Sequence, residues 1–243
     1  MQDIIFTIKS QRKIAKDVYE MVLAGNTSAI TASGQFVNIK IDGFYLRRPI
    51  SVCDYDENTL TLVYKTIGKG TAEMAKYEVG KNLKILVGLG NGYDLSLSGD
   101  KPLLLGGGVG VPPMFNLCKK LISEGKKPTV ILGFNTKEEI FYEDEFKKLG
   151  AIVLVTTVDG SYGIKGFVTD AMKDIDYTYF YTCGPEPMLK AIFNASKTLG
   201  QFSFEERMGC GFGACMGCSC KTITGFKRIC KEGPVLKKEE ILW

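Results

Sequence analysis

The sequence predicts an α/β plus all-β protein, and three observations lead to this fold class. The N-terminal part is a series of short β-branched runs broken by Gly, Asn and Asp, which is the pattern of an antiparallel barrel. After Gly99 the rhythm changes to strand, turn and helix, as in a doubly wound parallel sheet. The last part is loop-rich and gathers cysteines. We therefore expect three domains, at 1–98, 99–202 and 203–243.

Barrel strands are expected where apolar and polar residues alternate or where β-branched residues gather. Between the third and fourth runs, the segment from Arg47 to Ser51 should also be extended, because proline biases the residue before it away from helix. The five runs are Ile4–Ile8, Val18–Leu23, Gln35–Ile41, Thr59–Tyr64 and Leu83–Val87.

In the second domain each strand should lead into a helix, and a glycine follows three of these helices. Repeated units of this kind imply a parallel sheet with helices on both faces. The expected strands are Pro102–Leu105, Thr129–Gly133, Ile152–Thr156 and Tyr177–Thr182. The expected helices are Pro112–Ser123, Glu138–Leu149, Phe167–Lys173 and Pro185–Leu199.

Four cysteines near the C-terminus have the spacing of a plant-type [2Fe-2S] cluster. Cys210, Cys215 and Cys218 form a C-x4-C-x2-C run, and Cys230 follows after eleven residues. Glycines between the first three cysteines allow a tight loop whose backbone N–H groups point at the negative charge of a cluster. This spacing predicts a protein that carries single electrons.

A structural zinc site and a disulfide framework are the competing interpretations. Zinc sites usually join two separated C-x2-C hairpins, whereas this chain has one compact loop and one distant cysteine. Eight cysteines without a signal peptide suggest a reducing cytoplasm, where disulfides are rare. Cys220 is a near neighbour of the ligands, but the C-x2-C step favours Cys218 over it.

Composition excludes several classes of function. Histidine is absent, so neither a Ser-His or Cys-His hydrolytic pair nor a Rieske centre nor a His-ligated haem can form. No apolar run approaches the ~20 residues that span a bilayer. The 31 basic and 27 acidic residues are interspersed and give a net charge of +4, so nucleic acid is a poor candidate for a partner.

Two segments of the barrel outline an anion site. Arg48, Pro49, Ile50 and Ser51 place a cation and a hydroxyl on extended backbone, and this motif alone could equally be an exposed edge strand. The second segment, Tyr64–Thr71, is a glycine-spaced turn before an expected helix at Thr71–Lys76. Helix starts of this kind bind phosphate. Together they predict a site for a flat, phosphorylated cofactor, with Arg48 and Ser51 facing Gly70 and Thr71.

Two further motifs lie at the carboxyl ends of predicted parallel strands, where ligands of such sheets collect. The first is a glycine-rich turn leading into a helix that begins with proline, which suits a pyrophosphate although it departs from the usual G-x-G-x-x-G pattern. The second opens with Cys183, which on its own is more often a small buried apolar residue. The candidate nucleotide residues are Gly106, Gly107, Gly108, Gly110, Pro112, Cys183, Gly184, Pro185 and Met188.

These motifs together resemble the ferredoxin-NADP reductase superfamily. The tail, from Glu206 through Cys220 and from Lys227 to Val235, narrows the resemblance to the electron-transfer subunits of NAD-dependent (class 1B) dihydroorotate dehydrogenase. The resemblance covers nearly the whole chain, and the tail is its most specific part.

The resemblance implies FAD on the barrel, NAD on the second domain and a [2Fe-2S] cluster in the tail. Arg48, Pro49, Ile50 and Ser51 would hold the flavin and its diphosphate. Electrons would arrive from an FMN-containing catalytic subunit that oxidises dihydroorotate, in a cytoplasmic heterotetramer that serves pyrimidine biosynthesis, and would leave as hydride to NAD. The other flavin residues would be Val63, Tyr64, Lys65, Gly70 and Thr71, and the cluster ligands Cys210, Cys215, Cys218 and Cys230.

Cys183 is expected near the contact between nicotinamide and flavin, where it shapes hydride transfer without forming a covalent bond. NAD is favoured over NADP because no arginine directly follows Gly133, although Lys137 is close. Two alternatives stay open: the small subunit of a NAD(P)-linked ferredoxin or sulfide oxidoreductase, and a non-catalytic zinc-binding module. Phe212, Met216 and Ile223 are candidates for a docking surface or for a simple cover over the cluster.

Overall fold

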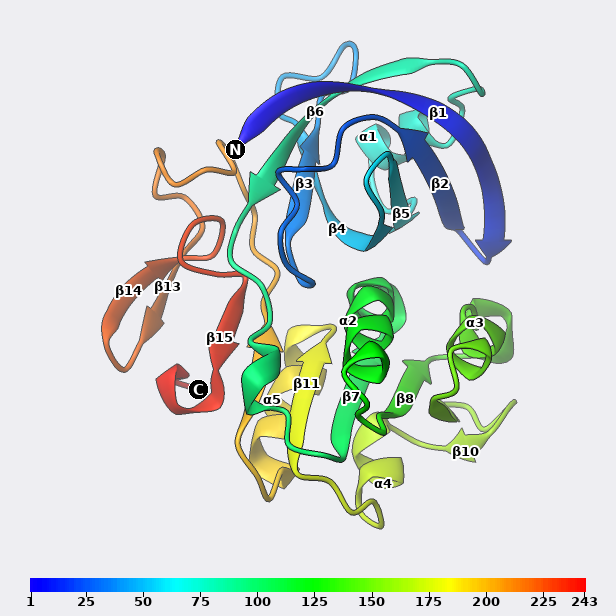
Figure 1. Cartoon of the computed structure of the whole chain (residues 1–243), viewed down its shortest axis with the longest axis vertical. Helices are drawn as coiled ribbons and strands as arrows, with labels where there is room; N and C mark the ends of the chain where they lie inside the picture. The colour runs from blue at the N-terminus through cyan, green and yellow to red at the C-terminus, as the bar shows by residue number, and fades with distance from the viewer.

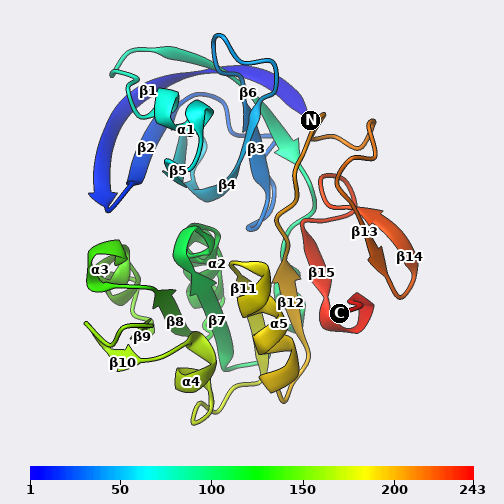
Figure 2. The ribbon, with the colours of Figure 1, turned by 180° about the vertical axis from the view of Figure 1, so that it is seen from behind.

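The structure is a computed structural model that describes residues 1–243. A barrel forms the upper half in Figure 1, a sheet with its helices forms the lower half, and the tail runs along one side of both. The view from behind in Figure 2 shows the same three parts, with α2 between the barrel and the sheet. This arrangement confirms the predicted fold class.

The barrel is closed by six antiparallel strands in the order β1-β2-β5-β4-β3-β6. All five predicted runs form strands, and the segment predicted to be extended, from Arg47 to Ser51, leads into the remaining strand, β4. Side chains alternate along β3, so Val37 and Ile39 belong to the buried interior of the barrel whereas Phe36 packs with residues of the sheet and tail. The strands are β1 (Gln2–Ala15), β2 (Val18–Ala24), β3 (Phe36–Ile39), β4 (Arg48–Tyr55), β5 (Thr59–Lys65) and β6 (Asn82–Leu89).

The second part is a seven-stranded sheet in the order β10-β9-β8-β7-β11-β12-β15. Every neighbouring pair is parallel except β12 with β15. The chain runs outward from β7 to β10 and then returns to the other side of β7, so a topological switch point lies between β7 and β11. The strands are β7 (Pro102–Gly107), β8 (Thr129–Phe134), β9 (Ile152–Thr157), β10 (Ile164–Lys165), β11 (Tyr179–Cys183), β12 (Gly200–Ser203) and β15 (Val235–Lys237).

Helices cover both faces of this sheet, and each face has its own buried cluster of side chains. The predicted helix Pro112–Ser123 is confirmed as α2, and α4 lies within the predicted range. The short 3-10 segments are η1 (Leu95–Leu97), η2 (Gly108–Gly110), η3 (Lys137–Glu139) and η4 (Lys238–Glu240). The helices are α1 (Lys69–Met74), α2 (Pro112–Ser123), α3 (Glu143–Lys148), α4 (Val168–Met172) and α5 (Glu186–Ala195).

The prediction of one helix over Glu138–Leu149 is wrong, because the chain breaks between η3 and α3. Tyr142 has a φ of 68°, in the left-handed region. Its hydroxyl donates a 2.7 Å hydrogen bond to the Glu20 carboxylate on the barrel. Phe141 and Tyr142 are both buried, so tertiary packing overrides the helical pattern here.

Two other predicted helices differ in their ends. The helix expected at Thr71–Lys76 is α1, which begins two residues earlier, where the Thr71 hydroxyl accepts hydrogen bonds from the N–H groups of Ile67 and Gly68. The helix expected to reach Leu199 ends at Ala195. There the Lys238 ammonium donates to the carbonyl and the hydroxyl of Ser196 at 3.0 and 2.6 Å, as a cation at a helix C-terminus should.

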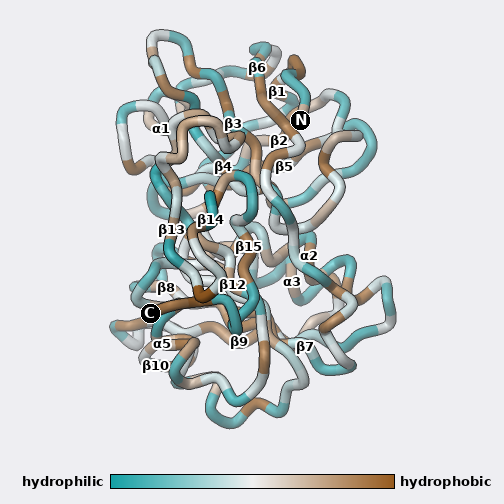
Figure 3. The backbone as a smooth tube through the Cα atoms, turned by 90° about the vertical axis from the view of Figure 1, so that its left-hand side faces the viewer, coloured by the Kyte–Doolittle hydropathy of each residue, from teal (hydrophilic) through white to brown (hydrophobic).

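The tail leaves the sheet after β12, rises beside the barrel, forms a hairpin and returns as β15 (Figure 3). The hairpin consists of β13 (Ser219–Thr222) and β14 (Gly225–Arg228). At the apolar end of the chain Ile241 is buried and Trp243 packs against Phe193 and Phe204. The tail therefore contributes a strand to the sheet as well as a loop. Taken over the whole fold, the helices are too short or too polar to span a membrane.

Candidate cluster, nucleotide and flavin sites

The four predicted ligands lie in the loop around the hairpin as two pairs of thiols. The Cys210 sulfur accepts hydrogen bonds from the backbone N–H groups of Ala214 and Cys215 at 3.3 and 3.4 Å. The Cys218 sulfur accepts one from the N–H group of Cys230 at 3.4 Å. Backbone N–H groups directed at sulfur stabilise thiolate ligands.

The electrostatics of the two pairs differ. Burial would raise the pKa of Cys210, but the N–H groups of Cys215, Phe212 and Ala214 outweigh it and lower that pKa to about 6. Burial, together with the neighbouring Cys218 thiol, raises the pKa of Cys230 to about 12. The Cys210 thiol near the surface is thus ready to ionise, whereas the buried Cys230 thiol needs a bound cation to do so.

The arrangement of the thiols in two pairs fits a two-iron cluster. Such a cluster takes two terminal thiolate ligands on each iron, and the hydrogen bonds pair Cys210 with Cys215 and Cys218 with Cys230. No three side chains of His, Cys, Asp or Glu lie together as they would around one bound metal ion. All eight cysteines are free thiols, and Cys220 is a half-buried member of β13.

Two groups hold the cluster loop in place. The Arg228 guanidinium donates a 2.7 Å hydrogen bond to the Gly213 carbonyl between the first two ligands, and it also pairs with Glu232. Asn91, in the connection between the barrel and the sheet, accepts from the N–H of Val235 at 2.9 Å and donates to its carbonyl at 2.7 Å. It also donates to the carbonyl of Glu232 at 3.1 Å. The segment after Cys230 is thereby fastened to the rest of the molecule.

The glycine-rich turn lies at the carboxyl end of β7, as predicted. Gly106 and Gly107 end the strand, Gly108 and Gly110 form η2, and Pro112 begins α2. Gly108 has a φ of 52°, which favours glycine. No partner backbone or side chain lies within 4 Å of where a Cβ on Gly108 would stand. The turn that leads into α2 is therefore open at Gly108 to a ligand's phosphate groups.

The second motif packs directly against this turn. Cys183 is paired with Gly106 in the parallel register of β11 and β7. A Cβ on Gly110 would overlap the Cys183 carbonyl, and one on Gly184 would come 2.6 Å from the methyl of Met188. Pro185 caps α5. All the predicted nucleotide residues thus meet at the switch point between β7 and β11.

The Cys183 thiol is uncharged at neutral pH. Burial raises its pKa to about 12, and the Ser203 hydroxyl opposes this only in part. Its neighbour Tyr93 donates a 3.1 Å hydrogen bond to the Thr182 carbonyl. A neutral thiol is a poor nucleophile, which agrees with a role in shaping the site.

On the barrel, the structure brings Arg48 to the α1 turn. A Cβ on Gly70 would overlap the Arg48 guanidinium, so only glycine allows this approach. The Nη1 atom of Arg48 donates to the Leu46 carbonyl at 2.5 Å, and the guanidinium stacks over the Phe44 ring at 5.1 Å. Arg48 and Gly70 therefore form one cationic corner next to Thr71, suited to a diphosphate.

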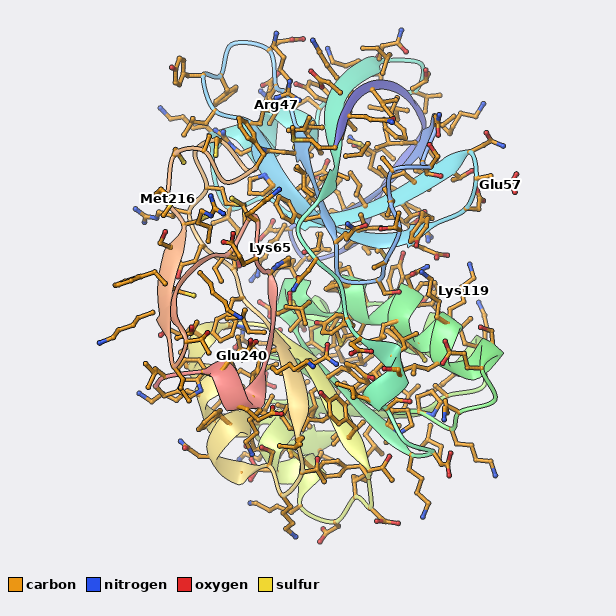
Figure 4. The ribbon with its side chains drawn as sticks, turned by 60° about the vertical axis from the view of Figure 1, so that its left-hand side comes forward. Arg47, Glu57, Lys65, Lys119, Met216 and Glu240 are labelled. Carbon is orange, nitrogen blue, oxygen red and sulfur yellow. The ribbon has the colours of Figure 1, made fainter.

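The three residues of β5 face different surroundings. The side chain of Tyr64 is turned into the barrel, stacks on Tyr19 and donates to Gln11 at 3.1 Å. Only the backbone of Tyr64 is thus available to a flavin. Val63 belongs to the cluster between barrel and sheet, and Lys65 pairs with Glu139 at 3.5 Å across the same boundary (Figure 4). Pro49, Ile50 and Ser51 remain partly exposed on β4.

Two family models match the chain. Residues 205–242 match the iron-sulfur cluster binding domain of dihydroorotate dehydrogenase B, and residues 104–193 match the oxidoreductase NAD-binding domain. A protein of Fusobacterium nucleatum subsp. nucleatum named dihydroorotate dehydrogenase B (NAD(+)), electron transfer subunit, is 45% identical, over 97% of this chain and 96% of its own length. One of Geobacillus sp. with the same name is 42% identical over 97% of each chain. The chain belongs to this family of electron-transfer subunits.

Solved structures agree with this family assignment. The structure described as NADH-dependent reduced ferredoxin-NADP oxidoreductase superposes with a TM-score of 0.88 at 30% identity, over 98% of this chain and 90% of that one. Phthalate dioxygenase reductase shares the fold alone, with a TM-score of 0.67 and 16% identity over 85% of this chain and 70% of that one. The family resemblance and the ferredoxin-reductase-like architecture are thereby confirmed.

Membership of the electron-transfer family makes the chain an oxidoreductase subunit that uses FAD, a [2Fe-2S] cluster and NAD. The predicted residues form three sites that fit these groups. The paired thiols suit the cluster, the glycine-rich turn suits NAD, and Arg48 beside Gly70 suits the diphosphate of FAD. Sequence motifs did not indicate Asn91, because its partners Glu232 and Val235 are distant in the sequence. Asn91 follows Gly90, whose φ of 68° beside Pro234 is the only local sign of the contact.

Proposed function

We propose that this chain transfers electrons from a dihydroorotate-oxidising, FMN-containing catalytic subunit to NAD+, as part of pyrimidine biosynthesis in the cytoplasm. The observation that carries this proposal is the tail, in which two thiol pairs sit on a loop matched to the dihydroorotate dehydrogenase B cluster domain. When bound, the cluster supplies one-electron transfer, the flavin exchanges one-electron for two-electron steps, and NAD+ accepts hydride.

The residues of the chain bind and orient these groups. The thiol pairs, Cys210 with Cys215 and Cys218 with Cys230, hold the cluster ends. Arg48, Ser51, Gly70 and Thr71 hold the diphosphate of the flavin, while Pro49, Ile50, Val63 and the backbone of Tyr64 and Lys65 lie along it. The turns Gly106–Pro112 and Cys183–Met188 receive the nicotinamide nucleotide.

The catalytic subunit is proposed to dock on the exposed apolar side chains beside the cluster. Phe212, Met216 and Ile223 are 42%, 55% and 61% exposed, and Phe226 on the hairpin is 73% exposed. Met216 lies at the outer edge of the tail in Figure 4. Exposed apolar residues gathered at a redox site are typical of a partner surface. An assembly with two copies of each subunit would bury two such surfaces.

The first test of this function is the anaerobically purified chain itself. We expect about one flavin and about two irons per chain and a visible spectrum that NADH bleaches. A colourless protein with about one zinc per chain would contradict the proposal and support a zinc-binding module.

A reconstitution test separates this function from its rival. The structural relative with 30% identity is described as a ferredoxin-NADP oxidoreductase, so a ferredoxin-linked partner is the alternative. We expect dihydroorotate:NAD activity only when the chain is mixed with a dihydroorotate-oxidising subunit. NADH oxidation coupled to the reduction of ferredoxin or of polysulfide, in preference to that activity, would favour the rival.

A further inference from the structure

A buried polar bridge joins α2 to the barrel. α2 lies between the barrel and the sheet (Figure 2) and packs against β4. On this helix Asn116 is only 4% exposed. The Ser33 hydroxyl donates to its Oδ1 atom at 2.6 Å, and its Nδ2 atom donates to the Asp54 carboxylate at 2.6 Å. Asn116 therefore connects α2 both to β4 and to the loop before β3.

The Asp54 carboxylate receives a second hydrogen bond from the same helix. The Lys119 ammonium donates to its other oxygen at 2.9 Å, and Lys120 donates to the hydroxyl of the next β4 residue, Tyr55, at 2.7 Å. The Lys119 side chain is 50% exposed, so its ion pair contributes little. The hydrogen bonds of Asn116 are shielded from water and are stronger for that reason. The contact of Asn116 with Asp54 is thus the main part of the bridge.

The rest of this boundary is apolar and leaves the exact position of α2 less well defined. Cys53 of β4, Val63 of β5 and Leu117 of α2 belong to one buried cluster. Apolar burial is non-directional, so such contacts tolerate small shifts of a helix along a strand. Hydrogen bonds need a narrow range of distance and angle. The bridge through Asn116 therefore selects one position of α2 relative to β4.

Both ends of the bridge adjoin the proposed cofactor motifs. Asn116 follows Pro112, the first residue of α2 and the end of the nucleotide turn, by about 6 Å along the helix. Asp54 follows Ser51, the end of the flavin motif, on the same strand, by about 10 Å. Helices and strands are stiff over such lengths. A shift at the bridge therefore moves the nucleotide turn relative to the flavin motif.

We propose that Asn116 is a positioning residue for hydride transfer, which holds α2 and β4 so that a nicotinamide at the nucleotide turn meets the flavin at reacting distance. The inference rests on the proposed function, because it requires both groups to bind where that function places them. Asn116 acts through Asp54 and Ser33. A displacement of about 1 Å between reacting groups slows a reaction about 100-fold, whereas binding of the nucleotide depends on the turn itself.

The first test is Asn116→Leu in the flavin-loaded chain, which removes the hydrogen bonds at similar volume. Stopped-flow absorbance at increasing NADH concentration separates the limiting rate of flavin reduction from the Kd for NADH. We expect the limiting rate to fall at least about tenfold and the Kd to stay within about threefold of the wild type. The long-wavelength charge-transfer absorbance of NADH stacked on oxidised flavin should weaken as well, and this signal reports the geometry independently of activity.

Two variants of Asp54 repeat the test from the other end of the bridge. The Asp54 side chain is 21% exposed, so the protein should fold without its carboxylate. Asp54→Ala removes the acceptor and should slow the limiting rate at least about tenfold. Asp54→Asn keeps an oxygen that accepts from Asn116 and should stay within about threefold of the wild type. This comparison separates the hydrogen bond from the charge.

Leu121→Ala is the control for a loss of stability alone. Leu121 is buried on the same helix, so its truncation should lower the melting temperature and leave the limiting rate within about threefold of the wild type. An unchanged limiting rate in Asn116→Leu or in Asp54→Ala would overturn the inference alone, as would an equal loss of rate in Leu121→Ala. A wild-type chain that binds no flavin, or whose flavin NADH does not reduce, would overturn the proposed function as well.

Discussion

The nucleotide turn and the cluster loop are both rich in glycine, but their glycines answer different needs. At the nucleotide turn, other protein atoms occupy the space that a side chain on these glycines would need. A Cβ on Gly110 would overlap the Cys183 carbonyl, and one on Gly107 would overlap Met188. In the cluster loop, Gly211 and Gly213 also approach protein, at Asn38 and Lys231, but Gly209 and Gly217 beside the ligands meet only the Cys215 sulfur, at 3.3 and 3.5 Å. The nucleotide turn is therefore shaped by the sheet, whereas the ligand-bearing part of the cluster loop at Gly209 and Gly217 is not closely packed against the rest of the protein.

The largest effect that this contrast predicts comes from removing a ligand. Cys218→Ser should reduce the iron content from about two per chain to nearly none. The sheet should persist, because its strands do not depend on the metal. Iron analysis and far-UV circular dichroism measure the two parts separately.

Cys220→Ser is the matched control for that experiment. It lies two residues away on β13 and should keep about two irons per chain. Loss of the cluster in this variant, together with its retention in Cys218→Ser, would reverse the ligand assignment.

A second prediction tests the nucleotide turn. Gly110→Ala should destabilise the folded protein by about 1–3 kcal/mol through overpacking against the Cys183 carbonyl. It should also weaken NADH binding at least tenfold. Chemical denaturation and NADH titration are the measurements. Gly209→Ala is the counterpart in the cluster loop and should be tolerated, so equal damage from both variants would refute the contrast.

A third prediction concerns the fastening of the cluster loop. Asn91→Ala removes three side-chain hydrogen bonds to Glu232 and Val235 and should cost about 1–3 kcal/mol. Faster hydrogen exchange of residues 233–235 should accompany it. The surface variant Asn82→Ala, which loses only an exposed bond to Thr7, should leave that exchange unchanged.

The smallest effect is expected at Cys183. Cys183→Ala should slow hydride transfer from NADH to flavin a few-fold, by stopped-flow absorbance, and full activity would exclude a role for this thiol. The raised pKa of about 12 keeps the thiol protonated in the folded state. Stability linked to this group is fully present below its ordinary pKa of 9.0 and is lost as the pH rises toward 12. The rate should therefore be independent of Cys183 ionisation below about pH 9.

Local patterns predicted what local interactions determine. The barrel runs, α2 and the four cysteines followed from alternation, glycine punctuation and spacing within a few residues. The break at Tyr142 could not be predicted, because Glu20 lies on a distant strand. Likewise β12 and the edge strand β15 are short strands that form only through pairing with each other and, for β12, with β11.

The same distinction holds for the site. Glycine turns and cysteine spacing carry their chemistry in the sequence itself. Asn91 has no motif, and only the return of the tail to the sheet brings Glu232 and Val235 next to it. The sequence also did not show that the Tyr64 side chain points into the barrel, because a tyrosine on a strand can face either side of the sheet.

The return of the tail as β15 has a consequence for cluster assembly. β12 and β15 are neighbours in the sheet, so the segment between residues 204 and 234 is a loop whose two ends are already joined. Closing this loop costs conformational entropy, and the pairing of β12 with β15, not metal binding, offsets that cost. Iron and sulfide thus bind ligands that are confined near one another beforehand, and the affinity of the site is higher than that of the same cysteines on a free chain.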